Sequence, residues 1–164
     1  MKLAVLADIH ANLPALQTVT GHIEAWNPDR VIVAGDVINR GPRSPECLAF
    51  ILEKQATAGW QVLKGNHEDY IIAHTKPDAP QSGPLLDIYR HTIWTLQQLN
   101  GDVSAFENWP DTICFAGPDG QEVRVTHASM LGNRRGIFPA MDEAELTRRV
   151  GEPEHRARRG RRAR

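Results

Sequence analysis

Short apolar runs alternate with longer amphipathic segments in the N-terminal half of the chain. The runs 2–7, 30–34 and 61–64 are apolar or β-branched and each stops at polar or glycine residues, which is typical of buried strands. Between them, residues 14–26 and 45–56 carry apolar side chains at helical spacing. Strands that alternate with helices of roughly 10 to 15 residues predict βαβ units and a largely parallel sheet.

The C-terminal half predicts a different arrangement. Residues 85–99 predict one helix. The segments 112–116 and 122–126 flank a Pro-Asp-Gly turn, which predicts an antiparallel hairpin. A last helix is predicted over 142–150, with Asp142 as its N-cap. The chain is therefore expected to be α/β, with an antiparallel element after the parallel sheet.

Residues that bind metals in proteins follow the predicted strands. Asp8 and His10 come after the first run, and Asp36 comes after the second. Asn66 follows the third run, and His127 follows the hairpin. Ligands of open α/β sheets bind outside the carboxyl ends of the strands, so we expect these side chains to meet at one sheet edge.

The residue types in this set suit two metal ions. Asp8 and His10 are two positions apart, so in extended backbone they point the same way and can bind one metal. Asp36 can bridge two metals, and the second can take Asn66 and His127. Two ions about 3.5 to 4 Å apart can share a hydroxide and stabilise an in-line displacement at phosphorus. The mixed ligand set suits several divalent metals, and we expect Mn²⁺, with Fe, Ni, Zn or Mg as alternatives.

Each of these motifs has a simpler interpretation when taken alone. An Asp-X-His triplet is common, a Gly-Asp pair is usually a turn, and a single histidine after a strand is usually a core or surface residue. Here the motifs occur in order, each after a predicted strand and the first three about 30 residues apart. This regularity favours a metal site over separate structural roles.

Three blocks also resemble a known family. They are 8–12 (Asp-Ile-His-Ala-Asn), 35–42 (Gly-Asp-Val-Ile-Asn-Arg-Gly-Pro) and 65–68 (Gly-Asn-His-Glu). They resemble the signature blocks of calcineurin-like metallophosphoesterases, and the resemblance extends from residue 1 to about 130. The second block is similar to that of phosphoprotein phosphatases and diadenosine tetraphosphate hydrolases, and the whole run is similar to small bacterial phosphodiesterases. The resemblance implies an αββα sandwich with a dinuclear metal site at the sheet edge.

The resemblance also implies roles for individual residues. His67 corresponds to the histidine that orients the phosphate and protonates the leaving oxygen, and Glu68 to a residue that steadies the loop. Arg40 is a candidate phosphate clamp, because guanidinium can bind two phosphoryl oxygens, although a solvent-exposed loop arginine is an equal alternative. Ala11 stands where many relatives have glycine. The implied metal ligands are Asp8 and His10 for the first metal, Asp36 as the bridge, and Asn66 and His127 for the second.

Length and composition place the chain among single-domain proteins. Its 164 residues are enough for one hydrophobic core. No stretch approaches the roughly 20 apolar residues that a transmembrane helix needs, and the N-terminus lacks a signal-peptide pattern. Cys47 and Cys114 are isolated, which argues against a disulfide framework. We therefore predict a cytoplasmic protein without membrane contact.

The charges divide the chain in two. Residues 148–164 hold eight of the 19 Lys and Arg residues, which leaves 11 basic and 18 acidic residues in 1–147. We predict a metallophosphoesterase domain over 1–147, whose acidity suits a site for cations, and an arginine-rich disordered tail over 148–164. Any contact of this tail with nucleic acid is expected at phosphates only and to weaken with salt.

One family block is missing from the sequence. The Gly-His-X-His block, whose histidines complete the two metals, has no match, and His155 follows no apolar strand. We favour a chain cut short by a frameshift or premature stop, and a natural short form with a working tail is the alternative. On either explanation the second sheet is expected to be incomplete and each metal to lack one histidine.

Together these features predict an enzyme. The expected activity is hydrolysis of phosphomonoesters or phosphodiesters by a dinuclear metal-bound hydroxide. The alternative is a catalytically impaired relative that binds metal or phosphate and contacts acidic partners through its basic tail. The sequence carries no signal for one phosphate-ester substrate or for an oligomeric state.

Overall fold

The computed structural model describes residues 1–80 and 82–151. Three strands, β1 (Leu3–Leu6), β2 (Arg30–Ala34) and β3 (Gln61–Leu63), form a parallel sheet in the order β1-β2-β3, and β3 leads into α3 (Asn66–Ala73). The strands are paired at Leu6, Val33 and Val62. Their carboxyl ends reach the same edge, which confirms the predicted parallel sheet.

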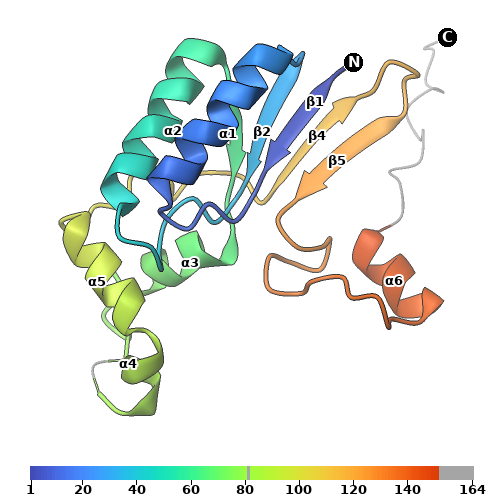
Figure 1. Cartoon of the computed structure of the whole chain (residues 1–164). Helices are drawn as coiled ribbons and strands as arrows, with labels where there is room; N and C mark the ends of the chain where they lie inside the picture. The colour runs from blue at the N-terminus through green and yellow to red at the C-terminus, as the bar shows by residue number, and fades with distance from the viewer. Residues whose placement is uncertain (81, 152–164) are drawn as a thin grey trace, which may run out of the picture.

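Two helices, α1 (Leu13–Trp26) and α2 (Ser44–Ala58), cover one face of this sheet (Figure 1). The Asn12 side chain accepts a backbone hydrogen bond and Pro14 lies in the first turn, so α1 begins where the local sequence favours it. Gly59, in the left-handed conformation, ends α2. The core between helices and sheet contains the buried side chains of Leu16, Ile23, Val33, Ile51 and Val62.

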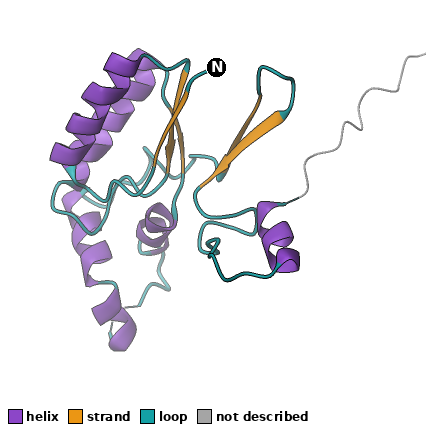
Figure 2. Cartoon of the chain, turned by 45° about the vertical axis from the view of Figure 1, so that its right-hand side comes forward, coloured by secondary structure: helices purple, strands orange, loops and turns teal. Residues whose placement is uncertain are grey.

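A hairpin of β4 (Thr112–Ala116) and β5 (Glu122–Thr126) faces the other side of the parallel sheet (Figure 2). The two sheets share a second apolar cluster that contains Ile32, Ala34, Leu63 and Ile113. Helices, parallel sheet and antiparallel sheet are therefore stacked in layers, which confirms the predicted sandwich fold. The second sheet has only these two strands within residues 1–80 and 82–151.

The single helix predicted over 85–99 is wrong. The chain forms two helices, α4 (Pro84–Ile88) and α5 (Arg90–Gln98), with Tyr89 between them. The direction of α5 depends on the buried Asn39 side chain, which hydrogen-bonds to two of its threonines, Thr92 and Thr95. This contact joins residues more than 50 positions apart, so local spacing cannot report it.

The last described helix is α6 (Glu143–Val150). The Asp142 carboxylate accepts a hydrogen bond from the backbone N–H of Glu145 at 2.8 Å, which confirms the predicted cap. The predicted boundary between residues 147 and 148 falls inside this helix. The rest of the predicted tail, with His155, lies outside the described residues. In the described part of the chain, no helix is both long and apolar enough to cross a membrane.

Candidate metal centre and active site

The loop after β1 runs beside the loop after β2, and backbone hydrogen bonds join the two. The N–H groups of Asp8, His10 and Ala11 donate to carbonyl oxygens of residues 35–37 at 3.2, 2.9 and 3.0 Å. All three residues have positive φ, between 47° and 56°. The extended backbone expected for Asp8 and His10 is therefore wrong. Their side chains still converge, with 3.5 Å between His10 Nε2 and Asp8 Oδ1, because the loop turns rather than alternates.

Two glycines bring the second and third loops into contact. Gly35 has φ of 84°, and a Cβ added there would overlap the backbone of Gly65. A Cβ added at Gly65 would overlap the carboxylate of Asp36. Only glycine fits either position, so the close approach of the two backbones requires the glycines of the Gly-Asp and Gly-Asn pairs.

Glu68 fixes these two loops to each other. Its side chain is fully buried, and one carboxylate oxygen accepts hydrogen bonds from the N–H groups of Asp36 and Gly65, both at 2.8 Å. The other oxygen accepts from Val37 at 2.9 Å and Ile38 at 3.4 Å. Burial and the charge of Asp36 raise the pKa of Glu68 to about 7, although these donors favour the ionised form. The predicted loop-steadying role matches these contacts.

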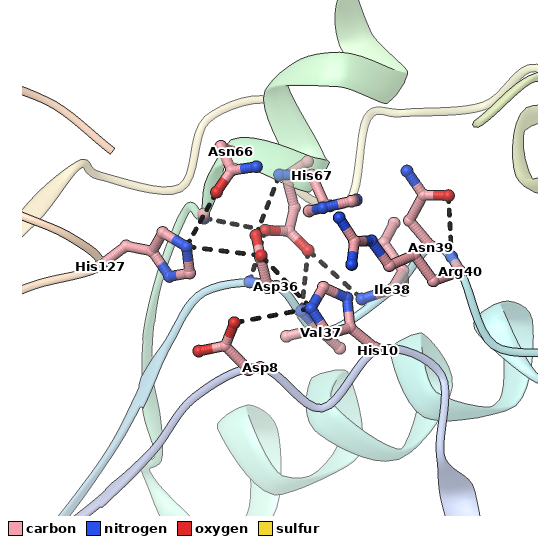
Figure 3. Close-up of polar contacts among 12 residues, drawn as sticks. Asp8, His10, Asp36, Val37, Ile38, Asn39, Arg40, Asn66, His67 and His127 are labelled. Atoms are coloured by element: carbon pink, nitrogen blue, oxygen red, sulfur yellow. Dashed lines mark hydrogen bonds and ion pairs between the residues drawn. The ribbon is translucent and has the colours of Figure 1, made fainter. Parts of the chain in front are cut away.

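Asp36 is the centre of the polar cluster (Figure 3). Its side chain is almost fully buried, and Oδ1 accepts a hydrogen bond from the backbone N–H of His67 at 2.9 Å. Oδ2 lies 3.4 Å from His127 Nε2 and 3.6 Å from His10 Nε2. His127 Nε2 also lies 3.1 Å from Asn66 Oδ1. The carboxylate therefore faces side chains from all the neighbouring loops.

The potential ligand atoms form two groups that share Asp36. One contains Asp8, Asp36 and His127, the other His10, Asp36 and His67, and within each group the atoms lie within 4.8 Å of one another. Four of the five predicted metal ligands fall in these groups, and the fifth, Asn66, contacts His127. The groups divide the ligands differently from the sequence prediction, because Asp8 falls with His127 and not with His10. His67 joins the second group, a ligand position that the sequence interpretation gave to no metal.

Several contacts suit a bound cation. Nδ1 of His127 contacts the carbonyl oxygen of Ala34 at 2.7 Å, an orientation in which a ligating histidine donates its other N–H to the backbone. Its Nε2 is then directed at Asp36. Nδ1 of His10 and Nδ1 of His67 are buried and have no hydrogen-bond partner among the described residues. The nitrogen of His10 that faces Asp8 and Asp36 is Nε2, and the convergence of these carboxylate and imidazole atoms fits a cation in this place.

The electrostatics of Asp36 and His127 are those of a carboxylate and imidazolium pair. The hydrogen bond with Asp36 raises the pKa of His127 to about 9 against the opposing effect of burial. Burial pushes the pKa of Asp36 upward, but His127, the backbone of His67 and the nearby positive charge bring it below its usual range. Both groups are charged at neutral pH, and a divalent cation would replace the proton of His127.

Arg40 lies on the opposite side of the centre from His127 (Figure 3). Asn39 and Arg40 both have positive φ, 77° and 68°, and the buried Asn39 side chain accepts a hydrogen bond from the backbone of Arg40. Burial is the main reason that the pKa of His67 falls to about 4, and the charges of His10 and Arg40 add to it. The guanidinium group of Arg40 is exposed and acts electrostatically on the site.

Comparison with known proteins identifies this arrangement. A family model described as calcineurin-like phosphoesterase matches residues 1–143. The chain belongs to this family. A curated relative, an uncharacterized protein of Methanocaldococcus jannaschii, is 24% identical over 127 residues, which cover 77% of this chain and 49% of that protein.

Solved structures agree with the family. A metallophosphoesterase from Sphaerobacter thermophilus has 26% identity and a TM-score of 0.52, covering 71% of this chain and 44% of that one. A hypothetical protein from Pyrococcus horikoshii OT3 has 19% identity and a TM-score of 0.72. The match covers 90% of this chain and 63% of that one, and it supports the fold. The chain thus spans about half the length of the curated relative and less than two thirds of these structures.

The calcineurin-like site also contains residues that sequence reasoning missed. The ring of His67 lies 5.3 Å from that of Tyr70 and 6.1 Å from that of His91. Burial and the charge of Arg40 lower the pKa of His91. Tyr70 lies on α3, one turn after His67, so helical spacing could have indicated it. His91 lies on α5, whose Thr92 and Thr95 hydrogen-bond to the buried Asn39 side chain, and no sequence signal marks it.

Proposed function

We propose that the chain is a metal-dependent phosphoesterase that hydrolyses phosphomonoesters or phosphodiesters at a two-metal centre. The observation that carries the proposal is the position of Asp36. This one buried carboxylate is shared by two groups of potential ligands at the carboxyl edge of a parallel sheet. A bridging carboxylate between two donor sets is what a pair of cations needs.

The proposed ligands divide into one set for each cation. Asp8, Asp36 and His127 would hold one cation with Asn66 beside them, and His10 and Asp36 would hold the other. Two divalent cations bound there would supply Lewis acidity and would lower the pKa of a coordinated water. We propose Mn²⁺ for both, with Fe, Ni, Zn or Mg as alternatives. Glu68 keeps the loops that carry these ligands at a fixed separation.

His67 and Arg40 are proposed to act on the phosphoryl group. The buried imidazole of His67 is neutral at pH 7 in the free protein, because its pKa is about 4. A bound phosphoryl anion beside the ring favours the imidazolium, so the pKa rises when substrate arrives and the ring can donate a proton to the leaving oxygen. Arg40, which is exposed beside this ring, is placed to hold phosphoryl oxygens.

A matched set of variants tests the catalytic roles. Metal-stripped protein is assayed with Mn²⁺ on p-nitrophenyl phosphate and bis(p-nitrophenyl) phosphate. Asp36→Asn and His67→Ala should each lower kcat at least about a hundredfold, in the range for loss of a general acid or a metal ligand. His22→Ala, an exposed histidine on α1, is the control and should leave turnover unchanged. Full turnover by either site variant would exclude the role assigned to that residue.

Metal stoichiometry separates the enzyme from the alternative of a non-catalytic binder. Calorimetric titration of the metal-stripped full chain with Mn²⁺ should give two ions per folded chain. A single weak ion, together with turnover no greater than that of free Mn²⁺, would favour a relative that binds metal or phosphate without catalysis.

A further inference from the structure

A second arginine lies beside the candidate site in the loop after β5. The guanidinium carbon of Arg134 is 4.5 Å from the ring centroid of Tyr70, which is cation–π geometry. The ring of Tyr70 in turn packs edge-on against His67, at 5.3 Å and 76° between planes. One aromatic ring therefore separates Arg134 from the histidine proposed to contact the phosphoryl group.

The loop that carries Arg134 is attached to the same helix as Tyr70. Nδ2 of Asn133 donates to Oδ2 of Asp69 at 2.7 Å, and Asp69 is the residue before Tyr70. Two consecutive residues of the loop thus contact two consecutive residues of α3. The position of Arg134 beside the site is fixed by a hydrogen bond and by ring stacking together.

The charge of Arg134 is available to a ligand. The side chain is exposed, and no carboxylate of the described residues pairs with it. Asp69, the acid closest along α3, is already engaged by Asn133 and by Lys64 Nζ at 3.4 Å. A cation–π contact engages the charge of the guanidinium group and does not require its N–H donors, which can therefore bind an anion.

Arg40 is the other arginine near His67, whose pKa it helps to lower. It too is exposed and pairs with no carboxylate within residues 1–80 and 82–151. Two guanidinium groups without a carboxylate partner therefore lie near the buried histidine. Arg40 acts electrostatically on its ring, and Arg134 lies beyond Tyr70. One phosphoryl group needs only the nearer cation, whereas two cations suit a ligand with two anionic groups.

We propose that Arg134 binds a second anionic group of the substrate, beyond the phosphoryl group held at the metal centre. The inference rests on the proposed phosphoesterase function and narrows its substrates to esters whose remainder carries a phosphate or carboxylate. Asn133 is a positioning residue, because it holds the loop against Asp69. Arg135 follows directly in the chain and is likewise exposed, so it is the matched control.

Two non-hydrolysable ligands separate this proposal from the function on which it rests. The Mn²⁺-loaded full chain is titrated calorimetrically with phenylphosphonate and with 4-carboxyphenylphosphonate, which differ by one carboxylate. The protein should bind the carboxylated ligand about tenfold more tightly, the size of one charge-assisted hydrogen-bonded pair. Arg134→Gln should abolish this preference and leave phenylphosphonate affinity within about twofold. Arg135→Gln should keep the preference.

The outcomes that overturn the proposal are distinct. Equal binding of both ligands by the unmodified chain, or an unchanged preference in Arg134→Gln, would exclude the role of Arg134 and leave the phosphoesterase proposal standing. No binding of phenylphosphonate by the unmodified chain would overturn both. Asn133→Ala should reduce the preference and raise KM for carboxylated esters without a change in kcat, and a fall in kcat alone would contradict its positioning role.

Discussion

Glu68 offers the sharpest test of how the site is held together. Its fully buried carboxylate accepts hydrogen bonds from four backbone N–H groups of the second and third loops. Glu68→Gln keeps the shape of the side chain but replaces one acceptor oxygen with an NH₂ group. Whichever way the amide turns, two backbone donors then face a donor.

The expected loss of stability follows from the two backbone N–H donors that lose their acceptor. Each buried donor left without a partner costs about 1–3 kcal/mol. Removing a buried charge offsets part of this cost, so the free energy of unfolding should fall by about 2–4 kcal/mol. Both loops carry proposed metal ligands, so the affinity for Mn²⁺ should fall in parallel.

Urea unfolding of the metal-free protein, followed by tryptophan fluorescence, measures the change. Glu53→Gln is the matched control, because this exposed glutamate on α2 lies far from the loops and should change stability by less than about 0.5 kcal/mol. If Glu68→Gln and Glu53→Gln unfolded at the same urea concentration, the hydrogen bonds of Glu68 would not hold the loops together.

Three further outcomes follow from packing and linkage. Gly35→Ala should lower the free energy of unfolding by at least about 3 kcal/mol, because Gly35 has φ of 84° and an added Cβ would overlap Gly65. Gly21→Ala on α1, where an added Cβ meets nothing within 4 Å, should raise it by about 0.5–1 kcal/mol; urea unfolding measures both. A thiol reagent at pH 8 should label exposed Cys114 and spare Cys47, because burial raises the pKa of the Cys47 thiol to about 11; rapid labelling of both would contradict the packing. Mn²⁺ at a hundredfold excess over Kd should raise the free energy of unfolding by about 2.7 kcal/mol per site, and EDTA should reverse the effect. Equal stability with Mn²⁺ and with EDTA would argue against metal binding.

The parts of the fold that the sequence predicts well are those where local pattern and tertiary need agree. The apolar runs before Asp8, Asp36 and Asn66 are strands, because apolar and β-branched residues favour burial in a sheet. The polar residues that follow each run mark the edge of the sheet. The Pro-Asp-Gly turn predicts the hairpin in the same way. These signals bring the candidate ligands to one edge without knowledge of any long-range contact.

The shape of the site was not predictable in the same way. An Asp-X-His triplet favours extended alternation, yet Asp8 and His10 have positive φ because their N–H groups bond to the neighbouring loop. Likewise, the buried Asn39 side chain sets the direction of α5 and so brings His91 to the site. Such contacts join distant residues, and no local spacing encodes them.

The site keeps its central carboxylate apart from its two arginines, which is physically unexpected because carboxylates and guanidinium groups attract each other. Asp36 pairs with histidines rather than with Arg40, whose backbone is held at positive φ by the Asn39 side chain. Arg134 is stacked on Tyr70 and is likewise kept from the nearby acids. Had either arginine paired with the central carboxylate, it would compete with a divalent cation for the same oxygens. Their separation leaves the carboxylate for the cations, and the arginines for the anion, of the proposed phosphoesterase centre.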